Sequence, residues 1–139
     1  MERILVLVKP DGVEKGNTGA ILARLEATGA KLVAARMMKL SRETAEKHYA
    51  VHRERPFFNS VVNYITSGPV LAAVFEGQEV ISRVRAAMGA TDPAKAEPGT
   101  IRKDFAENIE RNAVHGSDSP ETAEYEIPLY FKPEDIVSY

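Results

Sequence analysis

The chain alternates short apolar runs with stretches in which apolar residues recur at helical spacing. Residues 4–8 and 70–75 are continuous apolar runs rich in β-branched residues, which predicts central strands buried on both faces. Residues 31–40 alternate imperfectly between apolar and polar positions and predict another strand. A brief further strand is expected to lead into His115. The pattern therefore predicts a sheet of four strands separated by helices.

Capping residues, glycines and prolines mark the ends of the expected helices. These helices open near Asn17, Ser41, Pro56, Gln78 and Ser119. Gly29 and Gly89 are predicted to stop two of them. In the last helix, Ser119 is a good N-cap and a proline follows at the first helical position. Pro128 is expected to end this helix, because the residue before a proline disfavours the helical conformation.

The order of these elements is that of a split βαβ unit. It predicts an α+β, ferredoxin-like sandwich, in which a four-stranded antiparallel sheet carries helices on one face and a helical-hairpin insert. Residues 9–12 predict a turn after the first strand. An irregular loop over 90–103 ends where Ile101, Phe105 and Ile109 predict a short helix. We expect residues 1–139 to form a single domain.

Composition excludes several classes of function. The chain has no cysteine, so it forms no disulfide and has neither a thiol nucleophile nor a thiolate metal site. Its formal net charge of −2 argues against nucleic acid as the main partner, so any anion site must be local. No apolar run approaches a membrane span, and the N-terminus does not resemble a signal peptide. These features predict a cytoplasmic protein without a membrane partner.

The stretch 111–120 is the best candidate for chemistry. His115 follows a short apolar pair and precedes the start of the last helix, a position where an anion can bind. Histidine is also the side chain that is largely neutral, and so nucleophilic, near pH 7. The alternative is that His115 is a surface or hydrogen-bonded structural residue, as most single histidines are.

Isolated cations suggest what such a histidine would act on. If Lys9, Arg85 and Arg102 converged on one cleft, they would bind polyphosphate oxygens, although dispersed surface cations are the commoner case. Glu126, expected near the C-terminal end of its helix, opposes the helix dipole and could instead orient an imidazole. No phosphate-binding glycine loop, GxGxxG motif, nucleophile elbow or HExxH motif is present.

Two other patterns leave alternatives open. His48 and His52 have the spacing of metal ligands on a helix, but no third ligand is evident, and we do not expect a structural metal. The apolar stripe that begins at Phe57 has helical spacing, which favours a core face. Tyr49 and Phe57 could instead form an aromatic clamp for a flat ring.

The motifs themselves identify a family resemblance over essentially the whole chain. They are VKPDGV near the start, HY, RPFF, SGPV, the loop MGATDPAKAEPGTIR and, above all, RNAVHGSD. The sequence closely resembles the nucleoside diphosphate kinases, in a short bacterial-type form. The resemblance implies transfer of the γ-phosphate of a nucleoside triphosphate, mainly ATP, to nucleoside diphosphates. It implies a ping-pong reaction through a phosphorylated His115.

The resemblance also implies roles for individual residues. Glu126 and Ser117 would orient His115, and Asn112 would bind the sugar hydroxyl together with Lys9. The residues in contact with phosphates or beside them would be Lys9, Tyr49, Arg85, Thr91 and Arg102. Phe57 would stack on the base, with Val61 and Ile109 lining the same slot.

Cofactor and assembly follow from the same resemblance. Mg²⁺ would be held mainly by the nucleotide phosphates rather than by protein ligands. A homo-oligomer is expected, with a hexamer favoured over a tetramer. One alternative of another class is a catalytically silent nucleotide-binding and assembly module of the same fold. The other is a nucleic-acid binder, which the net charge of −2 disfavours.

Overall fold

The computed structural model describes all 139 residues, and its centre is a four-stranded antiparallel sheet. The strands are β1 (Glu2–Val8), β2 (Lys31–Met38), β3 (Val70–Gly77) and β4 (Val114–Gly116), in the order β2-β3-β1-β4. The predicted sheet and its strand positions are therefore confirmed. A register shift lies in β2 between Leu32 and Ala34, which accounts for the imperfect alternation in that strand.

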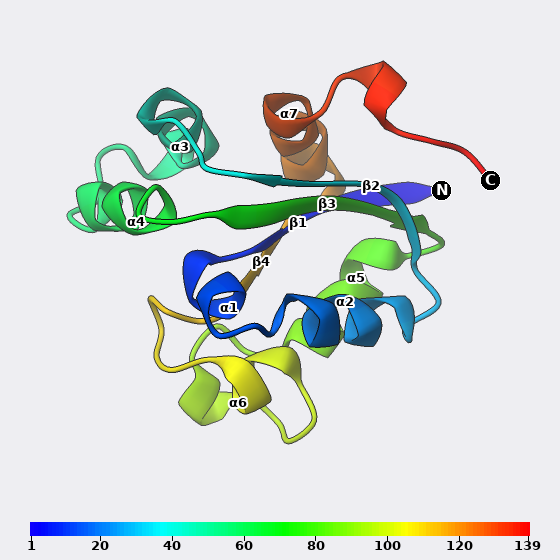
Figure 1. Cartoon of the computed structure of the whole chain (residues 1–139), viewed down its shortest axis with the longest axis horizontal. Helices are drawn as coiled ribbons and strands as arrows, with labels where there is room; N and C mark the ends of the chain where they lie inside the picture. Colours follow the sequence, from blue (N-terminus) through cyan, green and yellow to red (C-terminus); the bar gives the residue numbers. More distant parts are fainter.

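Helices cover both faces of the sheet, whereas the sequence predicted one face (Figure 1). On one side lie α3 (Arg42–His48) and α7 (Pro120–Tyr130), and on the other α2 (Thr18–Glu26) and α5 (Val80–Met88). The two central strands explain this arrangement, because consecutive residues of β1 and β3 are buried whichever face they point to. The core therefore extends above and below the sheet.

The remaining helices are short, and most of them lie near the end of the sheet that carries the site, whereas the turn Pro133–Asp135 lies beside the start of β1. They are α1 (Pro10–Glu14), α4 (Phe58–Ile65), α6 (Ile101–Phe105) and the 3₁₀ turns Ala50–His52, Pro93–Lys95 and Pro133–Asp135. The predicted helical-hairpin insert corresponds to α3 and α4, which pack together. No helix combines the length and apolar character needed to cross a membrane.

Three local predictions were wrong. The expected turn after β1 is the helix α1, because Lys9 is an extended N-cap residue and Pro10 takes the first helical position. Ile109 lies outside α6 and is 59% exposed. Pro128 lies inside α7, which continues to Tyr130.

Burial explains why α7 continues past its proline. An interior proline costs a helix about 3 kcal/mol. Ile127, Tyr130 and Phe131 are buried on either side of Pro128, and burying a large apolar side chain stabilises by about 1.5–3 kcal/mol. As a result, Glu126 lies just before the last turn of α7 rather than in it.

Candidate active site

His115 lies in the middle of β4, beside the central strand β1. Its register partner is Leu7, two residues before Lys9. The His115 Nε2 atom lies 3.0 Å from Glu126 Oε1 on α7, and Ser117 Oγ donates to the same oxygen at 2.9 Å. Ser117 is itself buried, and its Oγ accepts the N–H of Leu5 at 3.0 Å. One ring nitrogen of His115 is therefore occupied, and Nδ1 remains for chemistry.

Burial keeps the His115 imidazole neutral. It lowers the pKa of His115 from 6.5 to about 3, and the positive charge of Lys9 acts in the same direction. Burial raises the pKa of Glu126, while His48 and the Ser117 hydrogen bond oppose that rise. At neutral pH, His115 therefore has a lone pair on one nitrogen without needing a base to remove a proton.

The backbone just before β4 is strained and firmly held. Ala113 has a φ of 73°, which is unfavourable for a residue with a Cβ. Its N–H donates to Asp11 Oδ2 at 3.0 Å, and its carbonyl accepts the N–H of Lys9 at 2.9 Å. Asp11 is fully buried and also accepts the hydroxyl of Tyr64. These contacts fix the end of β1 against the segment that carries His115.

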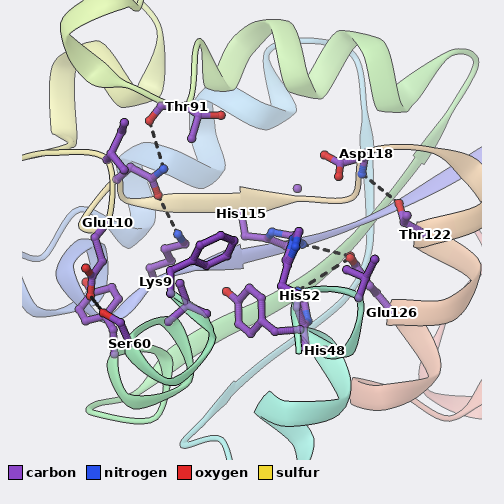
Figure 2. A pocket seen from close by; sticks show the side chains of 18 of the residues that line it. Lys9, His48, His52, Ser60, Thr91, Glu110, His115, Asp118, Thr122 and Glu126 are labelled. Atoms are coloured by element: carbon purple, nitrogen blue, oxygen red, sulfur yellow. Dashed lines mark hydrogen bonds and ion pairs between the residues drawn. The ribbon is translucent and has the colours of Figure 1, made fainter. Parts of the chain in front are cut away.

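Lys9 reaches the site from the end of β1. Its Nζ donates to Asn112 Oδ1 at 2.8 Å, and Asn112 Nδ2 donates to the carbonyl of Thr91 at 3.2 Å, the chain of contacts drawn in Figure 2. Burial, together with the neighbouring charge of Arg102, lowers the pKa of Lys9 from 10.5 to about 8. Lys9 is thus a cation placed where its charge is costly unless an anion binds nearby.

Two arginines are held by backbone carbonyls around β4. Arg102 donates to Val114 O at 2.8 Å and to Gly89 O at 3.0 Å, and its buried Nε has no partner. Burial, followed by the charge of Arg85, lowers the pKa of Arg102 to about 10. Arg85 donates to Gly116 O at 3.0 Å and pairs with Asp118 at 2.9 Å. Arg83, two residues away on α5, points elsewhere and donates to the carbonyl of Thr28 at 2.8 Å.

One cavity of about 530 Å³ collects the residues that the sequence singled out. All of the predicted site residues line it except Ser117, which is buried behind Glu126. The lining members of that set are Lys9, Tyr49, Phe57, Val61, Arg85, Thr91, Arg102, Ile109, Asn112, His115 and Glu126.

The mouth of this cavity is a slot between apolar side chains. Phe57 is 45% exposed, and Val61 and Ile109 line the same cavity. The polar groups Ser60 and Glu110 hydrogen-bond to each other at 3.1 Å. The core interpretation of the stripe on α4 therefore holds for its buried residues Phe58, Val62 and Ile65, but is wrong for Phe57 and Val61.

Sequence reasoning gave no role to His48, Asp11 or Asp118. His48 is buried against His115, with ring centroids 4.6 Å apart, and it does not form a ligand pair with His52. Its burial could have been predicted from helical spacing, because His48 follows Ala45 by three residues and so lies on the same buried face of α3. For Asp11 no comparable pattern exists, because its partners are far away in the sequence.

A neutral histidine, three cationic side chains and a flat apolar slot in one cavity define a nucleotide-binding kinase. The family model for nucleoside diphosphate kinase matches residues 2–136. The chain is 57% identical over its full length to the nucleoside diphosphate kinase of Dehalococcoides mccartyi, covering 98% of that relative. The chain belongs to the nucleoside diphosphate kinase family, and its reaction is phosphate transfer from nucleoside triphosphates to nucleoside diphosphates.

Solved structures agree with this assignment. The Aquifex aeolicus nucleoside diphosphate kinase superposes with a TM-score of 0.95 at 47% identity, over 98% of this chain and 99% of that one. A halophilic nucleoside diphosphate kinase from Halobacterium salinarum, solved in complex with CDP, superposes with a TM-score of 0.95 at 46% identity. This match covers 99% of this chain and 92% of that one. The predicted ferredoxin-like α+β fold is confirmed, and the catalytically silent alternative is not favoured.

Proposed function

We propose that His115 carries the phosphate between the two half-reactions. The Nδ1 lone pair attacks the γ-phosphorus, the bond to the β-phosphate oxygen breaks, and the diphosphate leaves. A second diphosphate then takes the phosphate in the reverse sense, giving a ping-pong reaction. The observation that carries the proposal is that Glu126 and burial leave His115 neutral, with Nδ1 as its free nitrogen.

Glu126 has a specific part in this step. When Nδ1 forms its bond to phosphorus, the proton on Nε2 stays in place and the ring becomes positively charged. The carboxylate 3.0 Å from Nε2 stabilises that charge and holds the reactive tautomer. Ser117 orients the carboxylate through its own hydrogen bond of 2.9 Å. Both residues therefore act through His115.

The cations bind the phosphates. Lys9, Arg85 and Arg102 surround β4, and the unfavourable burial of Lys9 and Arg102 is relieved when anionic oxygens approach. Thr91 and Tyr49, on the same cavity, lie beside the phosphates. Asn112 binds the sugar hydroxyl together with Lys9. The hydrogen bond of 2.8 Å between Lys9 Nζ and Asn112 Oδ1 is then partly replaced by hydrogen bonds to that hydroxyl.

The apolar slot takes the base. Phe57 offers its exposed ring for stacking, and Val61 and Ile109 line the opening. Every base has a flat face, so stacking without hydrogen bonds to base edges accepts them all. ATP serves as the main donor because it is abundant rather than because its base is selected.

Mg²⁺ is proposed to bind together with the nucleotide, mainly through its phosphates. A hard cation prefers oxygen ligands. Three carboxylates line the cavity: Glu126 contacts His115, Glu110 accepts from Ser60, and the exposed Asp118 pairs with Arg85. This donor set fits an ion held mainly by phosphate oxygens, with Asp118 able to contribute. Such an ion would offset the negative charge of the phosphates during transfer.

Assembly and location complete the proposal. The 139 residues act as a single cytoplasmic domain that forms a homo-oligomer, a hexamer in preference to a tetramer. The exposed loop around Pro93 and a second cavity of about 570 Å³, lined in part by Ile127, Phe131 and Ile136, support contacts between copies. Sedimentation equilibrium distinguishes the two assemblies by mass.

The central test is a labelling and chase experiment. Purified protein is incubated with γ-labelled ATP and Mg²⁺ and is then given unlabelled GDP. We expect the protein to take up acid-labile, base-stable label and to pass it to GDP. His115→Ala should not be labelled, whereas the control His52→Ala, which keeps His115, should still take up label. Bound ATP without transfer of label to the protein would contradict the His115 route.

A further inference from the structure

His48 is a buried histidine that the proposed phosphate transfer does not use. It is 5% exposed, and its Nδ1 lies 2.8 Å from the hydroxyl of Tyr130. Its Nε2 is buried and has no hydrogen-bond partner. That nitrogen faces Glu126, whose Oε2 is 3.8 Å away, and the ring meets the ring of His115 edge to face at 4.6 Å. A buried polar atom without a partner calls for an explanation.

We propose that His48, His115 and Glu126 form a binding site for a transition-metal ion of the Zn²⁺ class. Each residue offers one ligand atom, and the three atoms lie within 4.8 Å of one another. Two imidazole nitrogens and one carboxylate oxygen are the donor set of open zinc sites, in which water fills the fourth position. Small side-chain adjustments would bring the three atoms to ligand distances around one ion.

The surroundings of the three residues fit such a site. Ligating histidines usually donate their other N–H to an oxygen, and Tyr130 Oη is placed to accept from His48 Nδ1. Ser117 Oγ similarly holds the ligating carboxylate at 2.9 Å. Lys9 would repel a cation, but it lies on the opposite side of His115 from Glu126 (Figure 2). The proposed ion therefore occupies the side of His115 away from Lys9.

The site would be distinct in chemistry from that of Mg²⁺. Mg²⁺ requires oxygen ligands and binds imidazole poorly, whereas Zn²⁺ and its neighbours favour nitrogen. An ion here would also need the Nε2 lone pair of His115, which moves the ring proton to Nδ1. The nitrogen expected to attack phosphorus would then have no lone pair. The metal would stop phosphate transfer while leaving the phosphate cations and the base slot free.

Co²⁺ provides a spectroscopic probe of this site. Metal-free protein is titrated with Co²⁺, and its visible absorption is followed until Zn²⁺ displaces it. We expect each chain to bind one Co²⁺ ion, with the visible absorption of a tetrahedrally coordinated ion. His48→Asn should weaken binding by about 100-fold and Tyr130→Phe by about tenfold, while the control His52→Asn should bind as the wild type. Equal binding by wild type and His48→Asn would overturn the proposal.

Nitrogen NMR of the unmodified protein gives a test that does not depend on a variant folding. With ¹⁵N-labelled histidine, Zn²⁺ should shift the Nε2 resonances of His48 and His115 and leave those of His52 in place. Shifts at His52 alone, or none, would overturn the site.

The inhibitory part of the inference rests on the proposed function and has its own readout. One equivalent of Zn²⁺ should abolish labelling of His115 without changing the dissociation constant for ADP, and a chelator should restore labelling. Zinc-free protein that is never labelled by ATP in the presence of Mg²⁺ would refute the His115 route and leave the metal site standing. Loss of ADP binding with Zn²⁺ would refute the inhibition as described.

Discussion

A single carboxylate makes the two ring nitrogens of His115 chemically different. Nε2 faces Glu126 at 3.0 Å, and Nδ1 has no comparable partner. Because burial lowers the pKa of His115 to about 3, the ring is neutral at neutral pH and carries its proton toward the carboxylate. At the residue scale, tautomer and charge are therefore set before substrate arrives.

Glu126→Gln tests this division of roles. The amide keeps the size of the side chain but cannot balance the positive charge that forms on the ring. A charge-assisted hydrogen bond contributes about 1.5–3 kcal/mol, so kcat should fall roughly 10- to 100-fold while nucleotide affinity changes little. Glu124→Gln, on the exposed side of the same helix, is the control. A normal kcat for Glu126→Gln would contradict the role assigned to the carboxylate.

Lys9 should set the alkaline limit of activity. Its pKa of about 8 means that the free enzyme loses this positive charge as the pH rises through 8. Since kcat/KM reports ionisations of the free enzyme, kcat/KM should fall above about pH 8. In Lys9→Arg, which stays charged, the alkaline limb should move to higher pH even if the plateau is lower. An unchanged limb would assign the ionisation to another group.

At the scale of elements, the predictions that succeeded depend on local contacts. The buried runs of β1 and β3, and the Ser119 cap of α7 with Pro120 behind it, are specified by neighbouring residues. The prediction that α7 ends at Pro128 was wrong, because burial of the residues on either side outweighs the local preference of the proline against a helix. Similarly, the helices on the second face follow from packing across the sheet, which no local pattern encodes.

The site shows the same division. The family resemblance named its members, and ten of them line one cavity with His115, but it did not reveal what holds them. His48 depends on a partner 82 residues away on α7, and Asp11 on one 102 residues away before β4. Such supports are set by three-dimensional contact and have no spacing that a single sequence can display.

Gly89 links two elements to the site and provides a test at this scale. It ends α5 with φ 85° and ψ 178°, a conformation essentially restricted to glycine, and a Cβ there would lie 2.5 Å from Thr100 Oγ1. Gly89→Ala should lower the free energy of unfolding by about 3 kcal/mol and displace Arg102, which donates to the Gly89 carbonyl. Urea unfolding should show the lower stability, and a lower kcat/KM should show the displacement of Arg102.

Gly16 is the matched control. Its φ of 74° is also positive, but nothing lies within 4 Å of an added Cβ. Gly16→Ala should cost only about 1 kcal/mol and leave kcat/KM intact. Equal losses of activity in both variants would show that Gly89 has no special connection to Arg102.

At the scale of the whole molecule, α3 and α7 close one face of the sheet through a buried polar contact. Tyr130 and His48 meet at 2.8 Å between the two helices. Burial lowers the pKa of His48 from 6.5 to about 3, with the nearby His115 contributing. The folded protein therefore keeps His48 neutral at pH values where the unfolded chain takes up a proton.

This difference predicts acid sensitivity with a definite sign. Below the unfolded pKa of 6.5 the unfolded state binds more protons, so stability must fall as the pH falls. From pH 7 to pH 5, His48 should account for a loss of about 2 kcal/mol. Urea unfolding at several pH values measures the slope, and His48→Asn should flatten it by that amount. An equally steep slope in the variant would rule out His48 as a source.

The pairing of Ser60 with Glu110 at the slot has a consequence beyond this molecule. Under the proposed function these two groups bind each other rather than a base edge, so the bases would be held through their flat faces, and adenine, guanine and pyrimidine nucleotides would exchange phosphate on equal terms. The free energy of transferring the terminal phosphate from a nucleoside triphosphate differs little from one base to another. The ratio of triphosphate to diphosphate would then be driven toward one common value in every nucleotide pool, so a change in the adenine pool would be transmitted to the other nucleotide pools by mass action alone.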